Sequence, residues 1–150
     1  MNVKATLSPE DIARACADAM WQQDDASKGL GMEIVDIAPG QAVMAMTVQP
    51  HMVNGQRIAH GGFIFTLADS TFAFACNTHN ERAVAAQCHV TFIRPGKLGD
   101  VLVASAREIS RSGRSGIYDV RVTSGDVVIA EFRGHSRTIG GSWLSGTTVK

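Results

Sequence analysis

The residues with the clearest capacity for chemistry lie within NGQRIAHGGFIFTLAD, positions 54–69. Asp69 is the only acidic residue in the long apolar run that follows the two glycines. Burying an unpaired carboxylate costs free energy, and Asn or Ser would fill the same space at lower cost. A carboxylate in such surroundings is typical of a functional group that acts as a nucleophile or as a general base on water. The alternative is a structural carboxylate held by the hydroxyl of Ser70 or Thr66.

Gly61 and Gly62 stand at the expected start of the helix that carries this carboxylate. The first turn of a helix has unpaired backbone N–H groups and the positive end of the helix dipole, which attract an oxyanion. A substrate carbonyl can approach the Gly62 N–H closely, and such a donor contributes ~3–4 kcal/mol in acyl transfer. Asn54 is a candidate for positioning a water or the carboxylate, and His60 for capping the helix or orienting the loop. Glycines and an Asn-Gly turn are also ordinary features where a loop becomes a helix.

Together these residues predict a site that cleaves an activated acyl group. Asp69 follows Gly62 by seven residues, which separates the two by ~10.5 Å along a helix axis. A reacting carboxylate oxygen must come within ~3–3.5 Å of the carbonyl carbon, and an Asp side chain is too short to span that gap. We therefore expect Asp69 of one subunit to face Gly62 of its partner, in a two-fold homodimer with two shared sites.

The elements that must position these residues follow from local sequence patterns. Ser8 and Pro9 begin an expected surface helix over residues 9–25, and Pro39-Gly40 separates the two alternating runs of a hairpin. The segment 62–80 is too long for a strand and is apolar on every side, so we expect a buried helix there. Further strands are expected at 82–94, 100–110, 115–124 and 127–138.

This order of elements predicts an α+β fold, with one antiparallel sheet wrapped around the central helix, in a single domain of 150 residues. A helix that is apolar on all sides needs cover beyond one face of a sheet, and a second copy of the chain can supply it. The chain is 45% hydrophobic with a net charge of zero, which gives no electrostatic reason to expect nucleic acid or an anionic membrane as partner.

The cysteines and histidines indicate neither a disulfide framework nor a metal site. Cys16, Cys76 and Cys88 lie in apolar surroundings without CxxC spacing, as reduced core residues do. The histidines show no paired metal spacing, so we expect no metal. The N-terminus has no signal-peptide core, and no stretch of about 18 apolar residues occurs. We therefore expect a cytoplasmic protein.

Several motifs carry a family resemblance over residues 28–141. NGQRIAHGGFIFTLADSTFAFACN, FIRPGKLGD, GIYDV and FRGHSRTIGG, in this order, are similar to those of the hot-dog-fold acyl-CoA thioesterases. The resemblance implies hydrolysis of aryl-acetyl-CoA esters, hydroxyphenylacetyl-CoA among them, as in phenylacetate degradation. It also implies a site formed by Asn54, Gly62 and Asp69, no cofactor besides the coenzyme A of the substrate, and homotetramers built from two dimers. The N-terminal helix and the tail after Gly141 are less constrained.

Coenzyme A carries phosphates, so cations are expected at the mouth of the pocket. Arg94 precedes Pro95, and Arg111 and Arg114 lie in the turn SRSGRSG. These three arginines are candidate phosphate contacts. Each of them is equally consistent with a solvated arginine in a turn.

Two other functions remain open from the sequence. A hot-dog hydratase or dehydratase needs an acid–base pair, and His60 lies about two and a half helical turns from Asp69, which is too far within one chain. A non-catalytic acyl-CoA sensor of this fold carries a DNA-binding helix-turn-helix, and residues 1–28 offer room for one helix only. Release of free thiol separates hydrolysis from hydration, and a loss of turnover in Asp69→Asn without a loss of binding excludes a pure binder.

Overall fold

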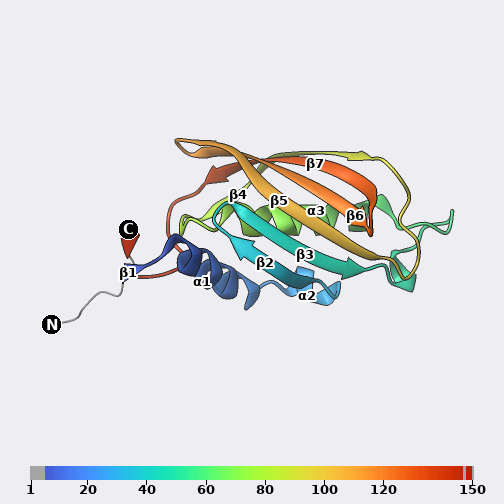
Figure 1. Cartoon of the computed structure of the whole chain (residues 1–150), viewed down its shortest axis with the longest axis horizontal. Coiled ribbons are helices and arrows are strands. Elements are labelled where there is room, and N and C mark those ends of the chain that lie inside the picture. Colours follow the sequence, from blue (N-terminus) through green and yellow to red (C-terminus); the bar gives the residue numbers. More distant parts are fainter. Residues whose placement is uncertain (1–5, 147, 150) are drawn as a thin grey trace.

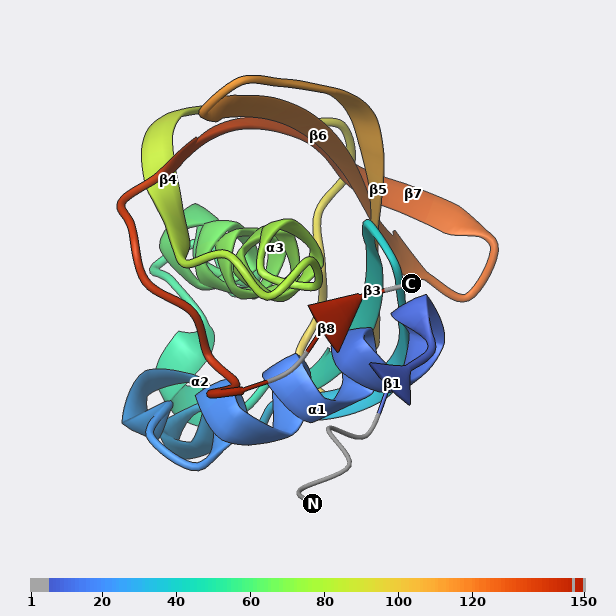
Figure 2. The same ribbon diagram turned by 90° about the vertical axis from the view of Figure 1, so that its left-hand side faces the viewer.

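The computed structural model describes residues 6–146 and 148–149, so residues 147 and 150 of the expected C-terminal tail lie outside it. A six-stranded sheet in the order β2-β3-β5-β6-β7-β4 curves around one long helix (Figure 1, Figure 2). The strands are β2 (Glu33–Ala38), β3 (Gln41–Thr47), β4 (Ala83–Phe92), β5 (Val101–Ser112), β6 (Ser115–Ser124) and β7 (Val127–Thr138). The helices are α1 (Pro9–Trp21), α2 (Asp25–Gly29), the 3-10 turn η1 (Pro50–Met52) and α3 (Gly61–Cys76), while β1 (Thr6–Leu7) pairs in parallel with β8 (Thr148–Val149).

All neighbouring strands of the large sheet are antiparallel, which confirms the predicted α+β architecture. The inward positions of β6 show the expected alternation, since Tyr118, Val120 and Val122 are buried against α3. Gly125 takes a φ of +56° in the two-residue turn between β6 and β7, a conformation that favours glycine. Among the described residues, no helix is long and apolar enough to cross a membrane.

Helix α3 lies close against the sheet because β7 presents a glycine beneath it. A Cβ at Gly134 would come within 2.8 Å of the Phe72 ring, so this close approach depends on the absence of a side chain. The buried face of the helix carries Ile64, Leu67, Ala68, Thr71, Phe72, Phe74, Ala75 and Cys76. This face forms the centre of the hydrophobic core.

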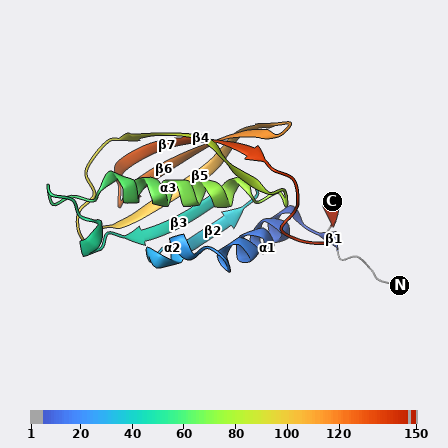
Figure 3. The same cartoon turned by 180° about the vertical axis from the view of Figure 1, so that it is seen from behind.

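The prediction of a helix over 62–80 that is buried on every side needs two corrections. Helix α3 begins at Gly61 and ends at Cys76, because the side chain of Asn77 bonds the carbonyl of Ala73 and both backbone groups of Ala83. One stripe of the helix is also left partly open, and in Figure 3 α3 lies in front of the strands. That stripe consists of Gly62, Thr66, Asp69 and Ala73, which the helical repeat places on one face.

The prediction of a single N-terminal helix over residues 9–25 is wrong, because the structure contains two helices, α1 and α2, in this part of the chain. Helix α1 ends at Trp21, and the carboxylate of Asp24 starts α2 by accepting bonds from the backbone N (2.9 Å) and the hydroxyl (2.7 Å) of Ser27. Such an N-cap competes with continuation of the preceding helix. The predicted cap at Ser8 is confirmed, since its hydroxyl accepts from the backbone N of Asp11 at 3.1 Å.

The two edges of the sheet differ. Helix α1 packs against β2 at one edge. Strand β4 forms the other edge, and no described strand pairs with its outer side. This strand exposes apolar side chains, with Val84 47% and Phe92 51% exposed. A long unpaired strand with exposed apolar residues is a surface on which a second chain can pair.

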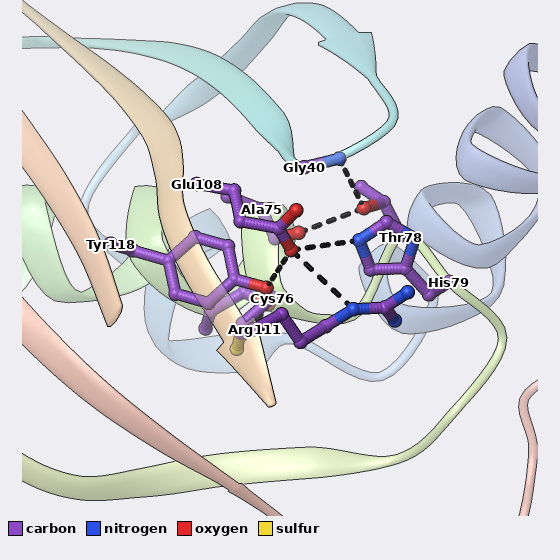
Figure 4. A network of polar contacts seen from close by, with 9 residues as sticks. Gly40, Ala75, Cys76, Thr78, His79, Glu108, Arg111 and Tyr118 are labelled. Atoms are coloured by element: carbon purple, nitrogen blue, oxygen red, sulfur yellow. Dashed lines mark hydrogen bonds and ion pairs between the residues drawn. The ribbon is translucent and has the colours of Figure 1, made fainter. Parts of the chain in front are cut away.

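A polar cluster fastens the C-terminal end of α3 to the sheet (Figure 4). The carboxylate of Glu108 on β5 accepts hydrogen bonds from Tyr118 Oη at 2.7 Å and from His79 Nε2 at 3.0 Å. Arg111 Nε lies 3.7 Å from the same oxygen. Burial raises the pKa of Glu108, but the bonds from Tyr118 and His79 outweigh burial and lower it below its usual value.

The predicted hairpin at Pro39-Gly40 is confirmed, and its turn contacts the same end of α3. Gly40 has a φ of +70°, and its backbone N donates to Thr78 Oγ1 at 2.8 Å. The Thr78 hydroxyl donates in turn to the carbonyl of Ala75 at 2.8 Å (Figure 4). The C-terminal end of the helix is therefore held by the β2–β3 turn and by Glu108 on β5.

Candidate active site

Asp69 lies two turns into α3, on the open stripe and beside β4. Its side chain is partly buried, and the thiol of Cys88 on β4 donates a hydrogen bond to Oδ1 across 3.7 Å. Burial raises the pKa of the Asp69 carboxyl, and the bond from Cys88 partly opposes this by favouring the charged form. A carboxylate with a raised pKa is a better base and nucleophile than one in water.

A cavity of about 360 Å³ opens beside this carboxylate. Most of its wall is apolar, and Asp69 is its only acidic residue. The lining comes from α1, α3, β4 and the segment after β7: Met20, Asp69, Phe72, Ala73, Cys76, Asn77, Arg82, Ala83, Val84, Ala85, Ile139 and Trp143. Such a cavity suits an apolar group attached to a reactive centre at Asp69.

The hydroxyls proposed to hold Asp69 as a structural carboxylate are engaged elsewhere. Ser70 Oγ lies 2.8 Å from Ser27 Oγ, and Thr66 Oγ1 donates to the carbonyl of Gly62 at 2.8 Å. Cys88 is the residue that bonds Asp69, and its position on a distant strand gave no local signal in the sequence. A purely structural role for Asp69, held by the hydroxyl of Ser70 or Thr66, is therefore not supported.

The start of α3 has the cap that His60 was expected to provide. His60 Nδ1 accepts a hydrogen bond from the backbone N of Gly62 at 2.9 Å. The predicted oxyanion donor is therefore occupied by an exposed imidazole in this structure.

Gly61 has a packing role that the sequence did not reveal. A Cβ at this position would come within 2.8 Å of the Phe92 ring on β4. Gly61 also lines a second cavity, of about 510 Å³, together with Asn54 and Arg94. Asn54 Oδ1 itself accepts from the backbone of its own loop, at 3.0 Å from the N of Gln56. The structure thus gathers Asn54, Gly61 and Arg94 at the N-terminal end of α3.

The three arginine candidates do not share a cavity within one chain. Arg94 lies beyond β4 and donates to the carbonyl of Val128 at 3.3 Å. Arg114 lies in the β5–β6 turn, but Arg111 lies near the end of β5 and not in the turn where the sequence placed it. Both are at the opposite end of α3, and Arg114 donates to the carbonyl of Thr138 at 3.0 Å. A common phosphate site for these residues requires a second chain.

The cysteines near the cavity are neutral thiols at pH 7. Burial raises the pKa of Cys76 to about 12 and that of Cys88 to about 11. A thiol that stays protonated is a poor nucleophile, so Asp69 remains the candidate reactive group of this cavity. Among residues 6–146 and 148–149, no group of three or more His, Cys, Asp or Glu side chains is arranged to hold a metal ion.

Comparison with known proteins connects this geometry to a family. The family model of the Thioesterase superfamily matches residues 56–131, from the loop before α3 into β7. This chain belongs to that superfamily. The thioesterase is 42% identical over 127 residues to the acyl-coenzyme A thioesterase PaaI of Escherichia coli (strain K12), covering 84% of this chain and 91% of the relative.

Solved structures agree with the family assignment. The E. coli PaaI protein, from the phenylacetic acid degradation operon, has a TM-score of 0.86 at 40% identity and covers 91% of this chain and 97% of its own. A Streptococcus mutans protein bound to acetyl CoA has a TM-score of 0.71 at 26% identity, covering 74% and 90%. The predicted hot-dog fold is confirmed. The thioesterase hydrolyses thioesters, so the hydratase and pure-binder alternatives are set aside.

Proposed function

We propose that this thioesterase hydrolyses acyl-CoA thioesters with aryl-acetyl groups, of the phenylacetyl and hydroxyphenylacetyl type, in phenylacetate degradation. The observation that carries the proposal is the position of Asp69, an ionisable carboxylate with a raised pKa at one wall of a mainly apolar cavity. The similarity to PaaI supports the acyl group, and the neighbour bound to acetyl CoA supports the carrier. The free cysteines are consistent with the reducing cytoplasm, where we expect the enzyme to act.

In the proposed reaction the thioester carbonyl accepts a hydrogen bond from the Gly62 N–H after His60 turns away. Asp69 then either attacks the carbonyl carbon or removes a proton from a water that attacks it. When Asp69 attacks, the carbon–sulfur bond breaks as an acyl–aspartyl anhydride forms, and water then hydrolyses this anhydride to the free acid and the Asp69 carboxylate. When Asp69 acts as a base, the oxygen of water bonds to the carbonyl carbon and the carbon–sulfur bond breaks as the tetrahedral intermediate collapses to the acid. In both routes the thiolate of coenzyme A takes up the proton that the attacking water gives up. Asn54, in the loop before α3, is assigned to positioning the water or the substrate.

A single turnover in ¹⁸O-labelled water separates the two roles of Asp69. Label in the Asp69 carboxylate indicates direct attack. Label found only in the acid product supports general-base catalysis. The same reaction run with a chelator and without any redox cofactor should proceed at the full rate, because the proposed chemistry uses side chains and water alone.

The proposed site is shared between two subunits. Gly62 and Asp69 lie on the same open stripe of α3, too far apart to act on one carbonyl within a chain. A two-fold axis beside α3 brings Asp69 to the partner's copy of that stripe, and it also covers the unpaired edge of β4. We propose a homodimer of this kind, assembled further into a dimer of dimers.

The same symmetry gives the arginines a common role. Two α3 helices related by a perpendicular two-fold axis run in opposite directions, so the N-terminal end of one lies beside the C-terminal end of the other. Arg94 of one subunit then approaches Arg111 and Arg114 of its partner. We assign these arginines to the phosphates of coenzyme A.

The proposal is tested with a panel of phenylacetyl-, hydroxyphenylacetyl-, benzoyl-, short aliphatic and long aliphatic CoA esters, following release of free thiol. We expect kcat/KM to be highest for the aryl-acetyl esters. A flat profile, or a preference for long aliphatic chains, would contradict the aryl assignment. A complete lack of thiol release would contradict acyl-CoA hydrolysis itself.

A further inference from the structure

The segment that follows β7 forms a strap, residues 139–144, across the connection between α3 and β4. Asn80 Oδ1 accepts from the backbone N of Trp143 at 3.0 Å and from that of Leu144 at 2.9 Å. Arg82 Nε donates to the carbonyl of Ser142 at 3.1 Å. The strap is therefore fixed by hydrogen bonds to residues that are about 60 positions away in the sequence.

The indole of Trp143 is held in one orientation. Its Nε1 donates to Asn77 Oδ1 at 2.9 Å, and the Arg82 guanidinium carbon lies 4.2 Å from the ring centroid. Asn77 is only 2% exposed, and its amide nitrogen bonds the carbonyls of Ala73 and Ala83. A buried, fully bonded amide and a cation over the ring together make Trp143 a rigid wall.

Trp143 and Asp69 line the same cavity. Asp69 and Asn77 are eight residues apart on α3, which corresponds to ~12 Å along the helix axis. Because Trp143 is bonded to Asn77, the indole stands at the end of the cavity that is remote from the carboxylate. The wall between the two consists of apolar side chains such as Phe72 and Val84.

The remote end includes residues from segments that lie outside the superfamily match. The match covers residues 56–131. Met20 on α1, together with Ile139 and Trp143 on the strap, lies outside that range and lines the cavity. The Asp69 end of the cavity thus lies within the matched residues, whereas Trp143 at the other end lies outside them.

We propose that Trp143 is the end wall of the acyl pocket and limits the length of the acyl group. The inference rests on the proposed function, since it takes Asp69 as the group that attacks or activates water. A cavity of about 360 Å³ lies at the small end of the range for small-molecule sites, roughly 300–1,000 Å³. A flat aryl-acetyl group fits between Asp69 and the indole, whereas a long aliphatic chain meets the ring.

The test compares three esters (butyryl-, phenylacetyl- and decanoyl-CoA) in the wild type and in Trp143→Ala. We expect the ratio of kcat/KM for decanoyl-CoA to that for phenylacetyl-CoA to rise roughly tenfold or more, because removing the wall opens room for several methylenes. Butyryl-CoA ends before the wall, so its kcat/KM should stay within about twofold. Trp21→Ala is the matched control, since Trp21 packs against Phe74 and does not line the cavity.

A second variant covers the case in which Trp143→Ala unfolds the strap. Ile139 lines the same end and is 55% exposed, so Ile139→Ala should leave the fold intact and raise the same ratio by a smaller factor. Unchanged ratios in both variants, with the wild type active on phenylacetyl-CoA, would overturn the end-wall proposal alone. Absence of thiol release from every ester in the wild type would instead overturn the proposed function.

Discussion

The Cys88 thiol donates a hydrogen bond to Oδ1 of Asp69 across 3.7 Å, from an edge strand to the open stripe of α3. Burial raises the pKa of Asp69, and this bond is the interaction that lowers it. The pKa of the Asp69 carboxyl is therefore lowered by a neutral thiol, since burial raises the pKa of Cys88 itself to about 11.

Cys88→Ala should raise the pKa of Asp69 further, because the charged carboxylate loses its donor. The acid limb of the kcat/KM profile should then move to higher pH, and Cys88→Ser should move it back because a hydroxyl restores the donor. The measurement is kcat/KM for phenylacetyl-CoA across pH 4 to 9, a range chosen for the assay around the ordinary carboxyl value of about 4. Superimposable profiles for the wild type and the alanine variant would refute the tuning role.

Asp69→Asn should lower kcat by roughly 10²-fold or more, because the amide is neither a base nor a nucleophile. The same variant should be at least as stable as the wild type at neutral pH. Because the pKa of Asp69 is higher in the folded protein than in the unfolded chain, the wild type loses stability as the pH rises from the unfolded value of about 3.9 through the folded value. An asparagine does not ionise, so the variant does not lose this stability. Thermal unfolding at pH 7 and at acid pH measures the difference, which should shrink in acid. Near-normal kcat would remove Asp69 from the mechanism.

Mixing two inactive variants, Asp69→Asn and Gly62→Pro, tests whether the site is shared. Proline is tolerated in the first turn of a helix and removes the N–H donor. In a shared arrangement each mixed dimer has one intact site and one doubly defective site, so random pairing restores roughly a quarter of wild-type activity. Differently tagged subunits verify the exchange. No recovery after verified exchange would place the whole site within one chain.

Gly134→Ala should destabilise the protein by about 1–3 kcal/mol, since its Cβ would overlap the fully buried Phe72 ring. Chemical denaturation gives the free energy of unfolding. Gly29→Ala is the control, because nothing lies within 4 Å of a Cβ at that position, and its effect should be within about 0.5 kcal/mol or stabilising. Equal stabilities of the two variants would contradict the role of Gly134 in seating α3.

Glu108→Gln should lower stability at neutral pH and have little effect in acid. The net lowered pKa of Glu108 means that its carboxylate stabilises the fold above the unfolded value of about 4.3, and that this contribution is lost as pH falls through the folded value. Melting temperatures at pH 7 and at about pH 3 measure the two regimes. Glu131→Gln is the control, because the exposed pair of Glu131 and Arg121 should contribute little. If the difference in melting temperature between the wild type and Glu108→Gln is the same at both pH values, the proposed contribution of this cluster is refuted.

Local patterns in the sequence were sufficient for the strands of the large sheet, for the central helix and for the choice of Asp69 as the candidate carboxylate. Periodicity, turn glycines and the cap at Ser8 each act over a few residues, so β6 and β7 match the predicted ranges 115–124 and 127–138. The solitary charge in an apolar run singled out Asp69 for the same reason. The break after Trp21 was missed because the cap at Asp24 competes with a helical pattern that continues through it.

Contacts between distant residues were decided by tertiary structure alone. Cys88 on β4 donates the hydrogen bond that lowers the pKa of Asp69. The ring of Phe92 leaves no room for a side chain at Gly61, and Trp143 bonds Asn77, which is 66 positions away in the sequence. Each of these pairs forms only when β4 and the strap pack against α3, and no local pattern records which side chains then meet. The sequence therefore determined which carboxylate is the candidate for catalysis, whereas the packing of the sheet and the strap decided its environment and the shape of the cavity beside it.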